Sequence, residues 1–248
     1  MKNLRILAVL AAIVLAMTLG LKAEPVACWD TPEVECDYWR PAQPVTYNDP
    51  EFPGCPITLY FDYQECHTNY NTVVSYNFRL TAISIPDDPA CIGLKTYLGL
   101  TPPNIIANQA KLFQIWKEGL EEVADEWFSW KDPMDYRCGI KSLTFRTVVP
   151  GGCASWAWAF KMNPIAGQTE FRFIPVPCSE DGCCIIDRKL CWDVANQEVD
   201  EEVSITILGG ENCGALSPLY DPFDTYGPEW TVCTPTPCVQ MCFIWSVE

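Results

Sequence analysis

The sequence has little positive charge and a single histidine. Its 248 residues include 16 lysines and arginines against 32 aspartates and glutamates, a formal net charge of −16. A surface this acidic repels nucleic acid and anionic lipid, and no basic cluster offsets it, so we expect no nucleic-acid partner. The single histidine, His67, excludes a site built from several histidines, and we expect no metal and no cofactor.

Several common catalytic motifs are missing as well. The chain contains no H-E-x-x-H, G-x-S-x-G, G-x-G-x-x-G or P-loop sequence, which argues against the metalloprotease, serine-hydrolase, dinucleotide and nucleotide sites that carry them. A Cys–His nucleophile would need a free Cys66 facing His67, yet neighbours on a strand point to opposite sides. We interpret His67 as a solvated turn residue, and no catalytic residue is identified.

No apolar run is long enough to span a bilayer, which takes about 20 residues. An uncharged, almost wholly apolar run, residues 6–21, follows a short basic start and precedes Lys22-Ala23, the pattern of a secretory signal cleaved after Ala23. A retained membrane anchor and a lipoprotein modified at Cys28 are alternatives that fit this segment less well. Removal of the signal peptide, residues 1–23, would leave 13 basic and 32 acidic residues, a net charge of −19, and no membrane contact.

Cysteine, in contrast, is abundant. Fifteen cysteines follow residue 23, and no two have the C-x2-C spacing of zinc sites and thioredoxin-type redox centres. In an exported chain such cysteines form disulfides, which indicates a secreted protein: extracellular, at the cell surface or periplasmic. The candidates are Cys28, Cys36, Cys55, Cys66, Cys91, Cys138, Cys153, Cys178, Cys183, Cys184, Cys191, Cys213, Cys233, Cys238 and Cys242. Because the count is odd, one cysteine must be unpaired, capped or bonded to another molecule.

The densest cysteine cluster is "PCSEDGCCIIDRKLC", residues 177–191. The adjacent Cys183 and Cys184 would point to opposite faces of a strand and reach two different partners. Cys184 and Cys191 flank "IIDRKL", which we predict to be a tight hairpin that these cysteines would close, although connectivity does not follow from sequence. The PC-x4-CC-x6-C spacing resembles that of cysteine-rich secreted bacterial proteins and implies no activity.

The chain divides into an arm and a body. Residues 24–56 contain seven prolines and little periodicity, so we predict an extended arm pinned by Cys28 and Cys36, ahead of a disulfide-rich α+β domain at 57–248. A half-buried strand at 55–66 is predicted to form a hairpin with the next strand. The further strands are predicted at 72–85, 141–149, 153–161, 169–176, 201–208 and 238–247.

One long amphipathic helix is predicted at about 102–130, with Thr101 as its N-cap and Gly119 weakening its middle by ~1 kcal/mol. Its apolar stripe comprises Phe113, Trp116, Leu120, Val123, Ala124 and Trp127. Its polar face comprises Asn108, Lys111, Glu118, Glu122 and Asp125. Such a helix packs on a sheet. The predicted fold class is therefore α+β: a mostly antiparallel, disulfide-rich β-sheet with one long helix across a face.

The most suggestive ligand-binding feature is "WAWAF", in which Trp156, Trp158 and Phe160 share one face of a strand. A flat aromatic row could stack against sugar rings or a partner protein. The alternative is that the row packs beneath the aromatic residues of the long helix. Carboxylates are plentiful, but runs such as Glu121-Glu122 are typical of solvated faces.

Two functional hypotheses follow. The first is an exported, disulfide-stabilised, non-enzymatic binding or structural protein of the surface, envelope or extracellular medium. The alternative is a secreted carbohydrate-active hydrolase with paired carboxylates beside the aromatic strand. We expect a protein or carbohydrate partner. An unpaired Cys28, or an unpaired Cys242 in an edge strand, would also allow a disulfide-linked homo-oligomer.

Overall fold

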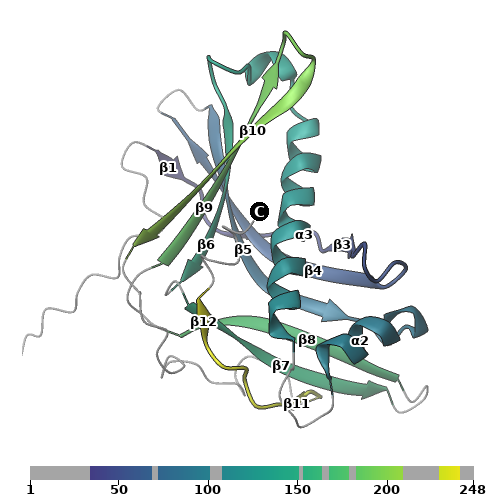
Figure 1. Ribbon diagram of the computed structural model, residues 1–248. Coiled ribbons are helices and arrows are strands. Elements are labelled where there is room, and N and C mark those ends of the chain that lie inside the picture. Colours follow the sequence, from purple (N-terminus) through teal and green to yellow (C-terminus); the bar gives the residue numbers. More distant parts are fainter. Residues whose placement is uncertain are drawn as a thin grey trace, which may run out of the picture.

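The computed structural model describes residues 34–68, 72–100, 108–150, 153–163, 168–178, 183–208 and 229–240 (Figure 1). The long strands are β4 (Pro56–His67), β5 (Val73–Ile85), β6 (Leu143–Pro150), β7 (Cys153–Asn163), β8 (Gln168–Pro177), β9 (Cys183–Asp193) and β10 (Glu198–Leu208). The short strands are β1 (Glu35–Cys36), β2 (Arg40–Pro41), β3 (Val45–Asn48), β11 (Thr231–Val232) and β12 (Val239–Gln240). The helices are α2 (Ile92–Leu98), α3 (Gln109–Ser129) and the short 3-10 turns η1 (Pro89–Cys91) and η2 (Pro133–Asp135).

The described strands form one mixed sheet that is mostly antiparallel. The main order is β10-β9-β6-β5-β8-β7-β11, and β4 pairs with the other edge of β5. The β5–β6 pair is parallel, whereas the β4–β5 hairpin and the other strand pairs are antiparallel. In β4 the alternating Ile57, Leu59 and Phe61 are buried. The predicted fold class and the predicted hairpin are therefore confirmed.

The proline-rich segment lies along the sheet wherever the structure describes it. Strands β1, β2 and β3 pair in turn with the free edge of β4. Tyr47 of β3 is buried, and the predicted link at Cys36 is confirmed as a disulfide to Cys66 of β4. The predicted signal peptide at 1–23 and the predicted link at Cys28 lie outside the described residues.

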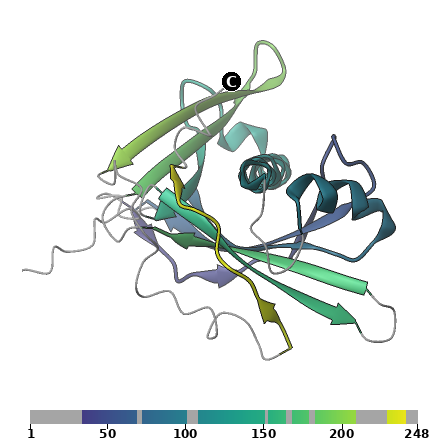
Figure 2. The same ribbon diagram turned by 60° about the horizontal axis from the view of Figure 1, so that its bottom comes forward.

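Strand β5 changes its partner halfway along one edge. Its first half, Ser75–Phe78, pairs in parallel with β6, and its end, Ile83–Ile85, pairs antiparallel with β8. Between them lies a segment that we call the fork, Arg79–Ala82. The sheet divides there into a first arm, β6-β9-β10, and a second arm, β8-β7-β11, which diverge in Figures 1 and 2.

Prolines terminate hydrogen bonding on the fork side of β8. In β7, the N–H of Trp156 donates to Thr236 and its carbonyl accepts from the N–H of Thr236, both on the side away from β8. Because backbone groups alternate along a strand, the residue opposite Trp156, Pro175, directs its nitrogen away from β7 and toward the fork. A proline carries no N–H, so this edge leaves no donor unpaired at that position.

Helix α3 lies against the sheet between the two arms (Figures 1 and 2). Its predicted apolar stripe is confirmed: five of the six residues are buried, and Trp127 is partly buried against the same core. The helix begins at Gln109, after a non-helical Asn108, and the predicted start near residue 102 lies outside the described residues. Thr101 itself lies outside the described residues.

Gly119 allows the helix to approach β4 closely. A Cβ atom at this position would clash with Cδ1 of Leu59 and would lie 3.4 Å from its Cγ and 3.7 Å from Cβ of Tyr47. Leu59 is fully buried, so its side chain has little room to move. The glycine costs helix propensity, as the sequence indicated, but it makes the helix–sheet contact sterically compatible with the core.

The predicted polar face of α3 is wrong at Lys111. This residue is only 4% exposed, and its Nζ lies 2.8 Å from Oδ2 of the fully buried Asp49 and 2.9 Å from Oε2 of Glu51. Burial by itself lowers the pKa of Lys111, but the two carboxylates outweigh it, and the pKa is raised. The charge of Lys111 is tolerated inside the core because the oppositely charged Asp49 is buried beside it.

The hairpin predicted across "IIDRKL" is wrong. Cys184 and Cys191 lie on one continuous strand, β9, which pairs with β6 on one side and with β10 on the other. The chain turns after β9 instead, where the carboxylate of Asp193 accepts the N–H groups of Ala195 and Asn196. Two-sided pairing keeps the central residues of β9 extended, and this could not be read from the local sequence.

Four disulfides have both cysteines in the described part of the chain. They are Cys36–Cys66, Cys55–Cys91, Cys138–Cys191 and Cys178–Cys238. Cys153, Cys183 and Cys184 are also disulfide-bonded. Each bridge restricts the unfolded chain and contributes roughly 2–4 kcal/mol. Such bridges suggest folding in an oxidising compartment.

One described cysteine, Cys233, is free and buried. Its side chain belongs to the main core cluster, and burial raises the pKa of its thiol to about 11. This location supports the interpretation of the odd cysteine as a buried unpaired thiol. Cys28, Cys213 and Cys242 lie outside the described residues, so the disulfide-linked oligomer stays a prediction.

We predict that Gly119→Ala lowers the free energy of unfolding by roughly 1–3 kcal/mol, because overpacking against Leu59 outweighs the gain in helix propensity. Urea unfolding of the oxidised protein measures the change. Combining the substitution with Leu59→Ala should cost less than the sum of the two single changes. An increase in stability for Gly119→Ala alone would contradict the close approach of α3 to β4.

Lys111→Met should lower the free energy of unfolding by roughly 3–5 kcal/mol at neutral pH, because it leaves the buried carboxylate of Asp49 uncompensated. Adding Asp49→Asn should recover much of the loss. Glu51→Gln is the control and should cost less than about 1 kcal/mol, since Glu51 is exposed. Because folding raises the pKa of Lys111, the contribution of the pair is full below the ordinary lysine pKa and is lost as the pH rises beyond it.

The thiol of Cys233 should resist alkylation at pH 8 in the folded protein, because it is buried and protonated. In denaturant without reductant it should react at once. Mass spectrometry after iodoacetamide treatment and proteolysis assigns the labelled position. Rapid labelling of Cys233 under native conditions would mean that this part of the core opens readily.

Candidate functional site

The aromatic row singled out in the sequence lies inside the protein. Trp156 and Trp158 are fully buried, and Phe160 is partly buried. The ring of Trp156 lies 4.8 Å from that of Phe113 and 6.1 Å from that of Trp116, both on α3. This burial favours the packing interpretation over the ligand-stacking one, because both tryptophan rings are closed to solvent and that of Trp156 is covered by the helix.

Trp127, the third aromatic residue expected above that row, packs elsewhere. Its ring lies 5.0 Å from Tyr63, 5.1 Å from Tyr76 and 5.2 Å from Phe78, in edge-on arrangements. It therefore joins the C-terminal part of α3 to β4 and β5, while Trp116 joins the earlier part to β7. The tryptophans of the helix fasten two different regions of the sheet.

A cavity of about 190 Å³ lies at the fork. It is lined by Arg79, Leu80, Trp116, Val148, Val149, Ala154, Pro175, Val176 and Pro177. The volume suits a small apolar molecule. The single charged side chain, that of Arg79, already pairs with Asp62 at 2.5 Å and lies over the ring of Trp39 at 4.7 Å, so it is engaged without a ligand.

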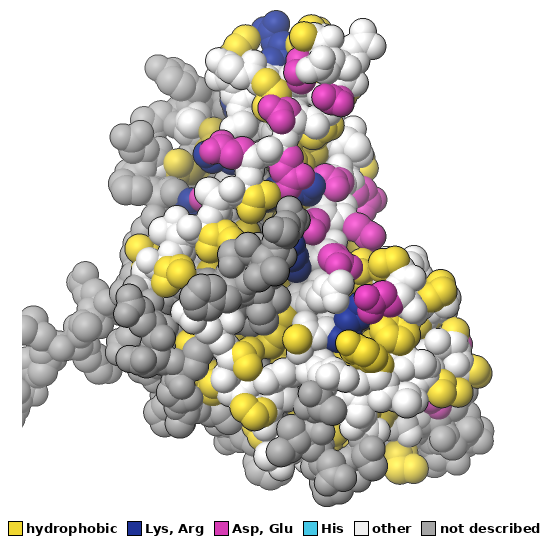
Figure 3. All heavy atoms as spheres, in the orientation of Figure 1, with side chains coloured by type: hydrophobic (Ala, Val, Ile, Leu, Met, Phe, Trp, Pro, Cys, Tyr) yellow, Lys and Arg dark blue, Asp and Glu magenta, His cyan; other side chains and the backbone are white. Residues whose placement is uncertain are grey.

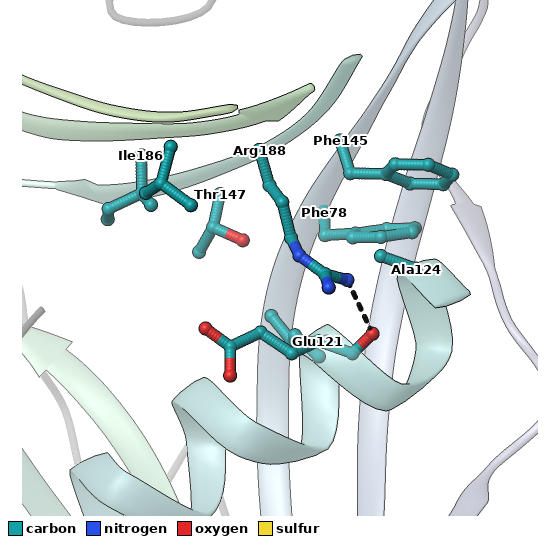
Figure 4. Close-up of a pocket in the computed structure, with 9 residues that line it drawn as sticks. Phe78, Glu121, Ala124, Phe145, Thr147, Ile186 and Arg188 are labelled. Atoms are coloured by element: carbon teal, nitrogen blue, oxygen red, sulfur yellow. Dashed lines mark hydrogen bonds between the residues drawn. The ribbon is translucent and has the colours of Figure 1, made fainter. Parts of the chain in front are cut away.

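A second, smaller cavity of about 20 Å³ separates α3 from the first arm. Figure 4 shows Arg188 of β9 reaching across it to the helix, where its Nη1 donates to the carbonyl of Glu121 at 2.9 Å. The same guanidinium pairs with Asp125 at 2.9 Å and donates to both carboxylate oxygens of Glu201 in β10 at 2.6 and 2.9 Å. Arg188 thus connects β9, β10 and α3.

The electrostatics of Arg188 fit a structural role. Burial lowers the pKa of its guanidinium, but the hydrogen bonds to Glu201 and Asp125 outweigh it, so the pKa is raised further and the group stays charged. The pKa of Glu201 is correspondingly lowered. The cavity has room for about one water molecule, and the guanidinium of Arg188 that borders it is already paired with Asp125 and Glu201, so this network holds the first arm in place.

Strand β10 ends the described sheet and leaves a long edge open. It pairs with β9 over eleven residues without a register shift, and no described strand pairs with its other edge. The N–H of Glu201 donates to the neighbouring carboxylate of Asp200 at 3.0 Å. Since backbone groups alternate in direction along a strand, the odd-numbered residues of β10 direct their N–H and C=O groups to the open edge.

The side chains of β10 are unusually exposed for a strand. Val199, Val203 and Ile207, on the face directed toward α3, are 45%, 50% and 45% exposed. The opposite face carries Asp200, Glu202, Ser204 and Thr206. Figure 3 shows acidic side chains gathered over α3 and around the β9–β10 pair. An open edge with exposed apolar side chains is a template for pairing with another strand.

Asp37, Glu65 and His67 are the residues most suited to holding a metal ion in the described chain. One ligand atom from each lies within 4.8 Å of the others, and Nε2 of His67 is 3.8 Å from Oε2 of Glu65. One imidazole and two carboxylates suit a divalent transition metal. Asp37 is already paired with Arg40 at 2.5 Å, which competes with a metal for its charge.

The interpretation of His67 as a solvated turn residue is wrong. It is the last residue of β4, paired with Glu35 of β1, and its side chain is 20% exposed. Cys66 beside it is bonded to Cys36, so a nucleophile built from Cys66 and His67 does not exist here. The sequence missed the grouping with Asp37 because it depends on β1 folding back along β4.

Comparison with known proteins gives no relative: no protein-family model, curated protein or solved structure matches the chain. Its function is therefore inferred from its own geometry. The described part of the chain contains no helix with the length and apolar character of a membrane crossing. Of the features described above, the open edge of β10 offers the largest unused set of binding groups.

The sequence predicted β10 as a strand but did not predict that it lies at the edge of the sheet. The strand was predicted at 201–208 and begins at Glu198. The edge strand was expected instead at 238–247, of which only Val239–Gln240 is described, paired with β7. The signal for an exposed strand was present in "EVDEEV", where three consecutive acidic residues separate the two valines, a pattern that a strand buried on both faces does not tolerate.

Proposed function

We propose that this chain is an exported, disulfide-stabilised, non-enzymatic protein of the cell surface, envelope or extracellular medium, and that it binds another protein through the open edge of β10. The disulfides support export, because they form and persist in oxidising compartments. The acidic surface supports solubility outside the cell. The single observation that carries the binding role is the eleven-residue edge of β10.

An edge strand binds by adding a strand to its sheet. The added chain supplies N–H and C=O groups to the open ladder, and its side chains alternate against those of the edge. In β10 the ladder groups come from the odd-numbered residues, and Val199, Val203 and Ile207 supply exposed apolar contacts beside them. Affinity would come from the backbone and selectivity from these side chains.

The edge is held rigid before any partner arrives. Strand β9 pairs with it throughout, Arg188 ties it to α3, and the Cys138–Cys191 disulfide fastens β9 to the segment that follows α3. A preformed strand loses little conformational freedom on binding, which is the main way in which preorganisation raises affinity. The disulfides therefore serve binding as well as stability.

A carbohydrate-active hydrolase needs two carboxyl groups across a cleft, about 5–10 Å apart. Among the residues that line the two cavities described here, Glu121 alone carries a carboxylate, and the aromatic row expected to wall such a cleft is buried. No observation on the described residues favours this alternative, so we do not propose it.

The binding role of the open edge is tested by replacing Val203, whose N–H points away from β9 to the open edge. Val203→Pro removes that donor without breaking the ladder to β9, whereas Val203→Thr keeps it and is the matched control. In the exported fraction, the native chain and the Val203→Thr variant should elute in a complex larger than one chain on size exclusion, and Val203→Pro should elute as a single chain. Equal thermal stability of the two variants shows that both fold. Identical elution of all three chains would contradict the binding role of β10.

A further inference from the structure

The exposed apolar residues of β10 are arranged symmetrically about Val203. Val199 and Ile207 lie four residues to either side, on the same face, with the same 45% exposure. In an antiparallel pair, advancing along one strand means retreating along the other. Two β10 strands centred on Val203 would therefore place Val203 opposite its own copy, and Val199 opposite Ile207 of the second copy.

The charges of β10 select the antiparallel direction. The acidic residues, Glu198, Asp200, Glu201 and Glu202, all precede Val203, and the uncharged "SITIL" follows it. In-register parallel pairing of two copies would set carboxylate against carboxylate, and like charges directly opposite destabilise a strand pair. Antiparallel pairing about Val203 sets each acidic half against an uncharged half.

On the outer face this register pairs two of the three carboxylates with hydroxyl groups, while Glu198, the first residue of the strand, lies opposite Leu208. Asp200 lies opposite Thr206 of the second copy, and Glu202 lies opposite Ser204. Hydroxyl groups can donate to carboxylates. The even-numbered residues occupy the non-hydrogen-bonded positions of the new ladder, where opposite Cα atoms are about 4.5 Å apart, so these side chains would be within reach of one another.

On the inner face the single carboxylate of β10, that of Glu201, is already neutralised. Glu201 would lie opposite Ile205 of the second copy, which would be unfavourable for a bare carboxylate. In this chain Arg188 donates to both of its oxygens, at 2.6 and 2.9 Å. The pair presents little net charge to the incoming strand, and the apolar contacts of Val199, Val203 and Ile207 lie on either side of it.

We propose that the partner of β10 is a second copy of this chain, paired antiparallel through β10 about a two-fold axis at Val203. The inference rests on the proposed function and completes it by naming the partner. All eleven residues of the strand find an opposite residue, and the two sheets become one. Because the interface is isologous, each copy uses the same edge and the assembly closes as a dimer. No intermolecular disulfide is required.

Thr206 provides a test of the register by charge. In the purified, oxidised full chain, Thr206→Glu would face Asp200 of the second copy twice per dimer and should raise the dissociation constant by about tenfold. Thr206→Lys, the matched variant, should lower it. Asp200→Lys combined with Thr206→Glu restores opposite charges and should return the dissociation constant toward that of the native chain. Sedimentation equilibrium measures all four, and thermal unfolding checks that each variant folds.

The outcomes separate this inference from the proposed function. A purified native chain that stays monomeric at every concentration, while Val203→Pro still abolishes the complex in the exported fraction, would overturn the self-pairing and leave β10 as the binding edge for a different protein. Equal effects of glutamate and lysine at position 206 would overturn the register. Opposite effects, with recovery in the double variant, would establish antiparallel pairing of Asp200 with Thr206.

Discussion

The divided pairing of β5 determines the rest of this structure. Along one edge β5 keeps a single partner, β4, but along the other it pairs first with β6 and then with β8. Two arms therefore diverge from one strand, and the concave side between them must be filled by something long and apolar. Helix α3 fills it: Trp116 packs on Trp156 in the second arm, and Arg188 reaches the helix from the first arm.

The position of α3 between the two arms sets two requirements for the helix. It must approach β4 closely, which Gly119 permits, and it must fix its own N-terminal end, which the buried pair of Lys111 and Asp49 does. Each arm also carries a disulfide. Cys138–Cys191 joins β9 in the first arm to the segment that follows α3, and Cys178–Cys238 joins the end of β8 in the second arm to the segment that precedes β12. The disulfides thus compensate for a sheet that is not closed on itself.

The sequence predicted those features that depend on local pattern. The alternation in "ITLYFDY" identified β4, and the helical spacing of Phe113, Trp116 and Leu120 identified the buried face of α3. It failed where tertiary pairing decides. "IIDRKL" resembles a hairpin only until strands on both sides hold it extended, and Lys111 looks solvent-exposed until Asp49 is brought beside it by the chain that follows β3. The candidate site depends on strand order, which no local pattern encodes, so β10 was recognised as a strand and not as an edge.

An open edge in a chain rich in exposed apolar residues is ordinarily a hazard, because any extended segment can pair with it. In β10 the acidic half limits that hazard, because carboxylates on an incoming strand would be repelled from positions 198–202. The strand itself avoids that repulsion when it is reversed, because its uncharged half, residues 204–208, then lies opposite those positions. Meanwhile Arg188 cancels the one carboxylate, Glu201, that would otherwise lie among the apolar contacts. The same charges that keep foreign strands away therefore leave the antiparallel copy as the partner with the fewest unfavourable contacts.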